Sequence, residues 1–401
     1  MRCEMKNPLY LKILFLVLSG VLGLLAGIEF WELRHYKETV VVSEDFSEKI
    51  MLSQYLPSLK NTWGDTPIYI YDSGVPGGSM LVLGGTHPYE PATTLATYVM
   101  MENIDVTSGK VYIIPHANMS ASTLGMLGNA YIKYYHIETP WGQKKYRVGD
   151  RGTNPLDQWP DPFTYVHYPS TQNLAYQDIR NLNRTFPGRP DGTLTERISY
   201  AIMELIRNED IDIFFDFHEA SLMYPVVSTY VAHDRSMDIA MMAAMMLSAT
   251  QFPMKCEASP KNLRGLTHRE VGDFSNTLAI LMETPEAFID RVVGRMSEEL
   301  MLEGKDEFLQ TAAEKGLVYC DYDIYEGFPD ALGNMIIGTP MDYRVGRHLS
   351  GTLEALNWMN QFFPDKAISV TFPNYVDVMS NGSGYYLHDP SKADPSRVFQ
   401  N

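Results

Sequence analysis

The chain has 401 residues, of which 45% are hydrophobic and 20% are charged, and its formal net charge is −17 at pH 7. That length suits one large domain or two, and the hydrophobic fraction is enough for a sizeable core. The acidic balance argues against a nucleic-acid partner, which needs a basic surface, and disfavours charge-driven binding to an anionic membrane.

The first element predicted along the chain is a membrane helix. Residues 13–28 are uncharged and almost wholly apolar, and with residues 8–12 the span reaches about 20 residues, the length that crosses a bilayer. Basic residues stand before it or at its start (Arg2, Lys6 and Lys12), so the positive-inside rule predicts a cytoplasmic N-terminus with the rest of the chain outside. A cleaved signal peptide, giving a secreted protein, is the alternative. We favour the anchor, because leucines stand where a cleavage site requires small residues.

The domain organisation follows from this span. We expect residues 1–35 to be the anchor with a short flank, residues 36–64 to be a linker or cap, and residues 65–401 to form one α/β domain. Cys3 would be cytoplasmic, so only Cys256 and Cys320 would lie on the extracytoplasmic side. The sequence leaves open whether these two cysteines pair.

Two polar side chains follow the end of a predicted strand. The apolar run at residues 80–83 is typical of the buried interior of a parallel sheet, and two glycines after it allow the chain to turn. His87 and Glu90 come next, and residues 91–102 can form the following helix. Because ligands of open α/β sheets bind at the carboxyl edge, we expect both side chains near each other at that edge.

A long segment separates this region from the next motif. Residues 119–176 follow a predicted strand at 111–114 and are rich in Tyr, Trp, Pro and Gly. Long segments without regular structure are usually functional, so we expect an insertion that forms a rim over the site.

Asn183 and Arg184 are candidate substrate-binding residues. The guanidinium fork of an arginine binds carboxylates through paired hydrogen bonds, with a geometric specificity that lysine lacks. Pro187 and Gly188 mark a turn, so the pair is expected on a loop. The alternative is an ordinary surface arginine in a turn.

A second predicted strand ends in His218. The amphipathic helix predicted at residues 195–208 leads into it, which gives a β-α-β order and a mostly parallel sheet. His87, Glu90 and His218 together form the kind of three-ligand set that holds a catalytic Zn²⁺ and leaves its fourth position for water. The alternative is that each histidine is a hydrogen-bonded core residue.

A third predicted strand, residues 277–282, ends in Glu283. A carboxylate at the end of a buried strand is costly unless it has a partner or a task. Beside a water on zinc, it could act as general base and then as general acid. Glu219 and Glu286 are rival carboxylates: Glu219 would point to the opposite side of its strand, and Glu286 would start a solvated helix.

The remaining elements are less informative about function. The sequence predicts strands at 68–71, 226–232 and 368–372, a Met-rich core helix at 237–249, and helices within 286–315 and at 353–363. The part from about residue 286 to residue 401 is therefore expected to be helical and mixed.

Four motifs in this order resemble the succinylglutamate desuccinylase/aspartoacylase branch of the zinc carboxypeptidase-like superfamily. They are GGTHPYE, NLNR, DFH and LMETP, which begin at residues 84, 181, 216 and 281. The likeness covers residues 65–290, approximately. It implies a doubly wound, mostly parallel or mixed sheet with flanking helices.

The resemblance also implies roles for the matching residues. Zinc would be held by His87, Glu90 and His218. The substrate carboxylate would bind Asn183 and Arg184, and Glu283 would be the catalytic acid/base.

The chain departs from the family pattern at several positions. Pro88 stands where Gly is common, and Asn181 replaces the usual Asp before the Asn-Arg pair. The family uses an upstream arginine to stabilise the developing oxyanion, and no position matches it cleanly. Arg180 is the nearest candidate, with Arg147 and Arg151 further away.

We therefore expect a membrane-anchored, extracytoplasmic zinc hydrolase that cleaves an amide bond adjacent to a free carboxylate. The resemblance favours a small N-acyl amino acid as the substrate. A zinc carboxypeptidase acting on short or cell-wall peptides is the alternative. A non-catalytic binding module on the same fold would have lost ligands that this chain keeps.

Overall fold

The computed structural model describes residues 8–125, 132–222, 227–287, 296–317, 328–329, 335–336 and 338–401. The chain divides into two units, Met1–Lys37 and Glu38–Asn401. In the first unit, α1 (Pro8–His35) is a continuous helix with no charged residue between Lys12 and Glu29. Its most apolar window has a mean hydropathy of 2.4, so α1 is long and apolar enough to cross a membrane.

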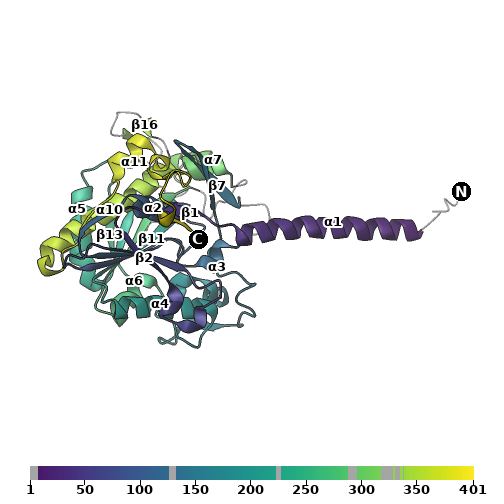
Figure 1. Ribbon diagram of the computed structural model, residues 1–401, viewed down its shortest axis with the longest axis horizontal. Coiled ribbons are helices and arrows are strands. Elements are labelled where there is room, and N and C mark those ends of the chain that lie inside the picture. Colours follow the sequence, from purple (N-terminus) through teal and green to yellow (C-terminus); the bar gives the residue numbers. More distant parts are fainter. Residues whose placement is uncertain are drawn as a thin grey trace. The chain divides into compact units, whose positions relative to one another are not determined.

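The second unit is built on an eight-stranded sheet (Figure 1). Its strands, from one edge to the other, are β13 (Lys255–Ala258), β12 (Thr229–Ala232), β14 (Leu278–Glu286), β11 (Ile213–Ser221), β4 (Ser79–Leu83), β6 (Lys110–Ile114), β3 (Pro67–Asp72) and β2 (Phe46–Met51). The pairs β14–β11, β11–β4, β4–β6 and β12–β13 are parallel. The pairs β12–β14, β3–β6 and β2–β3 are antiparallel, so the sheet is mixed, with a parallel centre.

Helices cover both faces of this sheet, which confirms the predicted α/β class (Figure 1). One face packs against α2 (Pro91–Asn103), α5 (Met237–Leu247), α10 (Met341–Phe362) and α11 (Tyr375–Asn381), and the other against α4 (Leu194–Asn208) and α6 (Thr267–Phe274). Alternate residues of a strand serve opposite faces. Met80 and Val82 belong to the first core, and Leu81 and Leu83 to the second.

The expected linker or cap at residues 36–64 is in large part integrated into the second unit. β2 is the edge strand of the main sheet, and β1 (Thr39–Val41) pairs with β18 (Val398–Gln400) near the other end of the sequence. Two short 3₁₀ helices, Leu52–Gln54 and Pro57–Leu59, follow β2. The mixed polarity that suggested a linker is that of an edge strand, whose outer face meets solvent.

The expected insertion contains small regular elements. They are α3 (Met119–Ser122), the antiparallel pairs β7 (Tyr134–Thr139) with β8 (Gly142–Arg147) and β9 (Tyr165–Val166) with β10 (Asn173–Leu174), and a 3₁₀ helix, η4 (Tyr176–Arg180). Residues 126–131 lie outside the described part of the chain. The next 3₁₀ turn, η5 (Leu182–Arg184), carries the Asn-Arg pair.

The C-terminal part differs from the prediction at several points. Glu286 is the buried last residue of β14 and does not start a solvated helix. The helices α7 (Glu298–Glu303) and α8 (Glu307–Glu314) follow, and residues 288–295 lie outside the described part. α10 begins well before the predicted residue 353, because buried polar residues in its first half hide the apolar period. β5 (Asp105–Ser108) pairs with β17 (Ser369–Thr371), and β15 (Phe328–Pro329) with β16 (Met335–Ile336).

The methionines of α5 were expected in the core, but Met241, Met245 and Met246 are about half exposed, and its buried face is formed by Ile, Ala and Leu. Cys256 is a free thiol, and Cys320 lies outside the described residues.

Candidate active site

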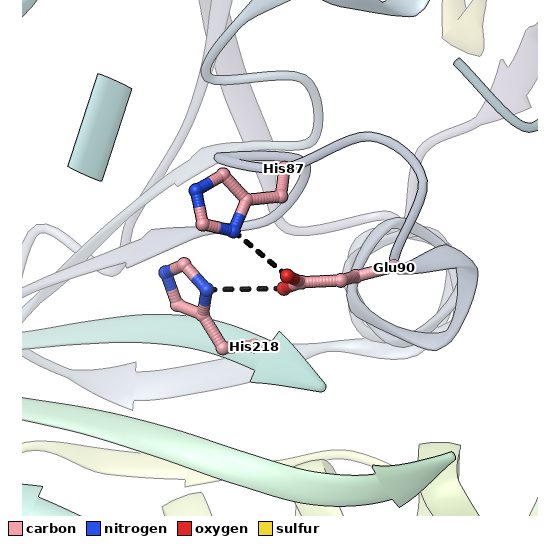
Figure 2. Close-up of side chains that lie close together, drawn as sticks. All are labelled: His87, Glu90 and His218. Carbon is pink, nitrogen blue, oxygen red and sulfur yellow. Dashed lines mark hydrogen bonds and ion pairs between the residues drawn. The ribbon is translucent and has the colours of Figure 1, made fainter. Parts of the chain in front are cut away.

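The three predicted ligands lie together at the carboxyl edge of the sheet (Figure 2). His87 lies in the turn after β4, Glu90 immediately precedes α2, and His218 lies within β11. One donor atom from each lies within 4.8 Å of the others, and all three residues are buried. The carboxylate of Glu90 lies between the two rings: its Oε1 is 2.7 Å from Nδ1 of His87, and its Oε2 is 3.0 Å from Nδ1 of His218.

The far side of each ring is held by a different group. Nε2 of His218 lies 2.9 Å from Oδ2 of Asp216, and Nε2 of His87 lies 2.8 Å from Oδ1 of Asn181. When Nε2–H donates to these oxygens, both Nδ1 atoms present lone pairs toward Glu90. Two imidazole nitrogens and a carboxylate that converge in this way, each with an orienting partner, are a donor set that fits zinc.

Charge within the cluster is balanced by a proton in the absence of a cation. Burial opposes ionisation of His218, yet the carboxylates of Asp216 and Glu90 raise its pKa well above the ordinary value. Burial lowers the pKa of His87 to about 4, so that ring is neutral. Burial also opposes ionisation of Glu90, but the two histidines lower its pKa on balance. A divalent cation would replace the proton of His218, because metal ligands bind in their deprotonated forms.

Glu283 lies beside this cluster. β11 and β14 are parallel neighbours, and His218 and Glu283 are partners in their register. The Oε2 atom of Glu283 has no hydrogen-bond partner among the described residues. Burial raises the pKa of this carboxyl to about 8, against the positive charge of His218. A carboxyl that exchanges a proton near neutral pH is suited to acid/base chemistry.

A pocket of about 390 Å³ opens beside Glu283 and the cluster. Asn183 and Arg184 line it, as do Tyr89 and Arg151. Oδ1 of Asn183 accepts from the backbone N–H of Thr267 at 2.8 Å, which fixes the orientation of its amide. The pocket therefore brings the predicted carboxylate-binding pair to the same cavity as the three candidate ligands.

The oxyanion candidate is the residue for which the geometry differs most from the prediction. Arg180 forms an ion pair with Asp161 at 2.7 Å and is not among the residues that line the pocket. Arg147 is buried and pairs with Glu38. Arg151 does line the pocket, and its charge lowers the pKa values of both His87 and Glu283. From the sequence, Arg151 was ranked below Arg180 as the oxyanion candidate, because the loop that carries Arg151 contains no motif.

Other residues around the site were not identified from the sequence. Asp216, Thr267 and His268 surround it: Thr267 donates from Oγ1 to Asp216 and from its N–H to Asn183, and His268 lines the pocket. The rival carboxylate Glu219 pairs with Arg344 at 2.7 Å. Among these residues, only Asp216 belongs to a motif recognised in the sequence, the DFH motif. Its role could not be predicted there, because it depends on contacts between distant segments.

Comparison with known families assigns the region around the site. Residues 165–311 match the model of the succinylglutamate desuccinylase/aspartoacylase catalytic domain. This segment is therefore similar to the catalytic domain of that family. The match confirms the resemblance seen in the motifs, and it includes Asn183, Arg184, His218 and Glu283. His87 and Glu90 lie before residue 165, so they are outside the segment of this chain that matches the family model.

Solved structures are also similar to part of the chain. A succinylglutamate desuccinylase from Silicibacter sp. TM1040 is 21% identical over 55% of this chain and 53% of its own, with a TM-score of 0.34. The ectoine utilization protein EutE (DoeB) from Ruegeria pomeroyi is 22% identical over 55% of this chain and 52% of its own, with a TM-score of 0.35. The chain thus spans only 53% and 52% of these two proteins.

A metallo-carboxypeptidase from Burkholderia cenocepacia is 10% identical over 80% of this chain and 66% of its own, with a TM-score of 0.43. No curated protein matches the sequence of the chain.

Proposed function

We propose that the chain is a zinc-dependent hydrolase that cleaves an amide bond adjacent to a free carboxylate, with N-acyl amino acids as its substrates. One observation carries the proposal. Glu283, a buried carboxyl without a partner for Oε2 among the described residues, is paired in register with His218 of the His87–Glu90–His218 cluster. A proton-exchanging group beside a set of metal donors is the arrangement that hydrolysis requires.

His87, Glu90 and His218 would hold the zinc ion. Zinc bound there would supply Lewis acidity toward the substrate carbonyl and the attacking water. Asp216 and Asn181 keep the two imidazoles in the tautomer that presents Nδ1.

Glu283 would manage the proton. Its ionised form takes the proton of the attacking water at the carboxylate, and its neutral form gives that proton to the nitrogen of the leaving amine. Burial supports the second step, since it favours the protonated form of Glu283.

Asn183 and Arg184 would bind the free carboxylate of the substrate and so position the scissile amide. Arg151 is the pocket cation nearest in role to an oxyanion-binding group, because its charge already acts on both His87 and Glu283. The similarity of residues 165–311 to the succinylglutamate desuccinylase/aspartoacylase catalytic domain supports a deacylase.

A carboxypeptidase acting on short peptides would use the same groups. The apolar helix α1 favours this second candidate, because a domain anchored outside the cytoplasm meets peptides rather than catabolic N-acyl amino acids. We assign α1 as the membrane anchor in either case.

The test uses the full chain, purified in detergent, and the Glu283→Gln variant. Zinc is measured by elemental analysis, and hydrolysis is measured on N-acyl amino acids and on short peptides with free C-termini. We expect Glu283→Gln to keep its zinc and to lose about 10²- to 10⁴-fold in kcat. Glu298→Gln, a half-exposed carboxylate that pairs with His136, is the matched control and should keep full activity. A Glu283→Gln protein as active as the native chain would refute the assignment.

A further inference from the structure

His268 is a buried polar residue that the proposed chemistry does not use. It lies in the first turn of α6, and its ring lines the pocket that Asn183 and Arg184 share with the candidate zinc ligands. Only 3% of the residue is exposed. Neither Nδ1 nor Nε2 has a hydrogen-bond partner among the described residues.

An imidazole in this condition is unfavourable in the empty protein. Leaving a buried polar group without a partner costs about 1–3 kcal/mol. Buried polar groups of native proteins are nearly always paired, so an exception in a pocket wall points to a partner that arrives from outside the chain. The partner of His268 is therefore expected to be part of the ligand that fills this pocket.

The position of His268 indicates which part of the substrate it meets. The preceding residue, Thr267, donates its backbone N–H to Oδ1 of Asn183 at 2.8 Å and its hydroxyl to Asp216 at 2.5 Å. Gly265 packs so closely on the backbone of Arg184 that a Cβ atom there would lie 2.1 Å from the carbonyl oxygen of Arg184. His268 is thus fixed beside the pair that would hold the substrate carboxylate.

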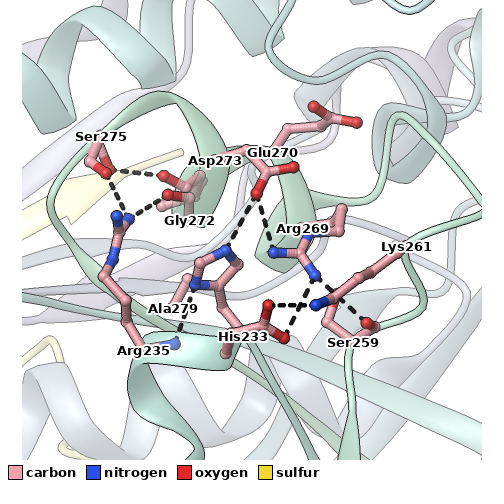
Figure 3. A network of polar contacts seen from close by, with 12 residues as sticks. His233, Arg235, Ser259, Lys261, Arg269, Glu270, Gly272, Asp273, Ser275 and Ala279 are labelled. Carbon is pink, nitrogen blue, oxygen red and sulfur yellow. Dashed lines mark hydrogen bonds and ion pairs between the residues drawn. The ribbon is translucent and has the colours of Figure 1, made fainter.

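A polar network links α6, the helix that carries His268, to neighbouring segments (Figure 3). Asp273 accepts from Arg269 at 2.9 Å and from His233 at 3.1 Å. Arg269 also donates to the carbonyl oxygen of Ser259 at 3.3 Å, which ties the helix to the loop that forms the pocket wall. The ring of His268 therefore belongs to a rigid part of the pocket.

The surroundings of His268 also determine its protonation. Burial lowers the pKa of His268 well below the ordinary value, and nearby cations including His218, Arg269 and Arg184 act in the same direction. The ring is consequently neutral, with one N–H donor and one acceptor nitrogen. A hydroxyl or a carboxamide can satisfy either nitrogen, whereas a carboxylate can only accept.

The rest of the pocket separates neutral from anionic ligands. Leu263 and Leu266 are among the apolar residues that line this pocket, and Glu257 lines it as well. A second carboxylate on the substrate would share the cavity with the carboxylate of Glu257. A neutral polar side chain carries no charge that Glu257 would repel, and it can form a hydrogen bond with the ring of His268.

We propose that His268 is a specificity residue that hydrogen-bonds a hydroxyl or carboxamide on the side chain of the amino acid whose carboxylate binds Asn183 and Arg184. This inference rests on the proposed amide hydrolysis. It names the substrate class: amides of polar, uncharged amino acids such as asparagine and threonine, in preference to leucine, valine and aspartate.

The test compares matched amino acids in the native full-length protein. Asparagine is set against leucine and aspartate, and threonine against valine, each as its acetyl, succinyl and glycyl derivative. We expect kcat/KM to be about 10- to 100-fold higher for the polar, uncharged member of each pair, since a buried group left unpaired penalises the apolar analogue.

Two variants assign the preference to the ring. His268→Leu should bring the asparagine-to-leucine ratio close to unity, and His268→Gln, which keeps a donor and an acceptor, should restore part of it. Both should retain the native zinc content, which separates specificity from folding and metal binding.

The outcomes distinguish the two proposals. Hydrolysis without a polar preference, or a preference unchanged in His268→Leu, would overturn the role of His268 and leave amide hydrolysis standing. A preference for aspartate would also overturn the assigned substrate class. A zinc-loaded native protein that cleaves none of these amides would overturn the proposed function and the inference with it.

Discussion

The carboxylate of Asp216 lies 2.9 Å from Nε2 of His218 and accepts its hydrogen bond. The same carboxylate accepts from the hydroxyls of Thr86 and Thr267, so it is held from three sides. We expect Asp216→Asn to weaken zinc binding by about 10- to 100-fold, because the amide orients the ring less firmly and makes it a poorer ligand. Competition with a chelator measures the affinity. Asp161→Asn, which removes the partner of Arg180, is the control and should bind zinc as the native protein does.

At His87, the substitution can be made in the opposite direction, from an amide to a carboxylate. Asn181 holds Nε2 of His87 through Oδ1 at 2.8 Å. We expect Asn181→Asp to tighten zinc binding by about 10-fold, since a carboxylate raises the basicity of the imidazole. The same chelator competition reports it. Unchanged affinity in Asn181→Asp and in Asp216→Asn alike would show that these contacts do not act on the metal.

Arg184 is expected to act in substrate binding. Lysine keeps the charge but loses the planar fork that binds a carboxylate through two hydrogen bonds. We predict that Arg184→Lys raises KM by about 10- to 100-fold, which corresponds to the loss of one charge-assisted hydrogen bond of about 1.5–3 kcal/mol. Steady-state kinetics on the preferred amide measures this change. The control is Arg207→Lys, which alters an arginine on α4 that pairs with Glu204 and should leave KM unchanged. A KM for Arg184→Lys within twofold of the native value would contradict the assignment of Arg184 to substrate binding.

Glu38 should make stability depend on pH. It accepts from His116, Tyr98 and the backbone of Arg147, and its side chain is fully buried. Burial opposes its ionisation, but the charges of His116 and Arg147 hold its pKa well below the usual range. Because the folded pKa lies below the unfolded one, the stabilisation is complete above the unfolded value of about 4.3 and is lost as the pH falls below it.

Glu38→Gln should therefore lower the free energy of unfolding by about 3–5 kcal/mol at neutral pH, as expected when one partner of a buried ion pair is removed. Its stability should also change less between neutral and acidic pH than that of the native protein. Denaturant unfolding at several pH values measures both effects. Glu48→Gln on the exposed face of β2 is the control, with an expected change below about 0.5 kcal/mol. If the free energy of unfolding depended on pH in the same way in Glu38→Gln and in the native chain, the assigned role of Glu38 would be refuted.

The membrane assignment has its own test. We expect the full chain to remain with membranes after alkaline carbonate extraction, because an apolar helix of this length inserts into the bilayer. Placing an arginine at Leu18, near the middle of α1, should cost about 2.5–3.5 kcal/mol of insertion and release part of the protein. Arginine at Lys12, already a cationic position, is the control. Full extraction of the native chain would argue for a cleaved signal or a soluble protein.

The fold was predictable where the sequence pattern is local. Apolar runs predicted β4, β6, β11 and β14, and parallel strand ends brought His87, Glu90, His218 and Glu283 to one edge, as the register of the sheet requires. Edge strands carry a weaker signal, because only one face of the strand is buried. This is why β2 was taken for part of a linker.

The rest of the site depends on contacts between distant segments. Arg151 reaches the pocket from a loop whose course follows from the packing of the insertion, and hydrophobic periodicity does not describe such a loop. The bond between Asn181 and His87 joins residues 94 positions apart. His268 stands in a short helix with polar neighbours, and only the tertiary structure shows that its nitrogens are enclosed. No local pattern contains these relationships.

The pairing of β1 with β18 has a consequence for how the domain assembles. Thr39 lies soon after α1, and its partner, Gln400, lies near the other end of the sequence. During synthesis, β1 leaves the ribosome long before β18 and has no strand to pair with until β18 has been made. Closure of this part of the structure therefore waits for the synthesis of β18. A change that disturbs β18 would leave β1 unpaired and exposed to chaperones and proteases.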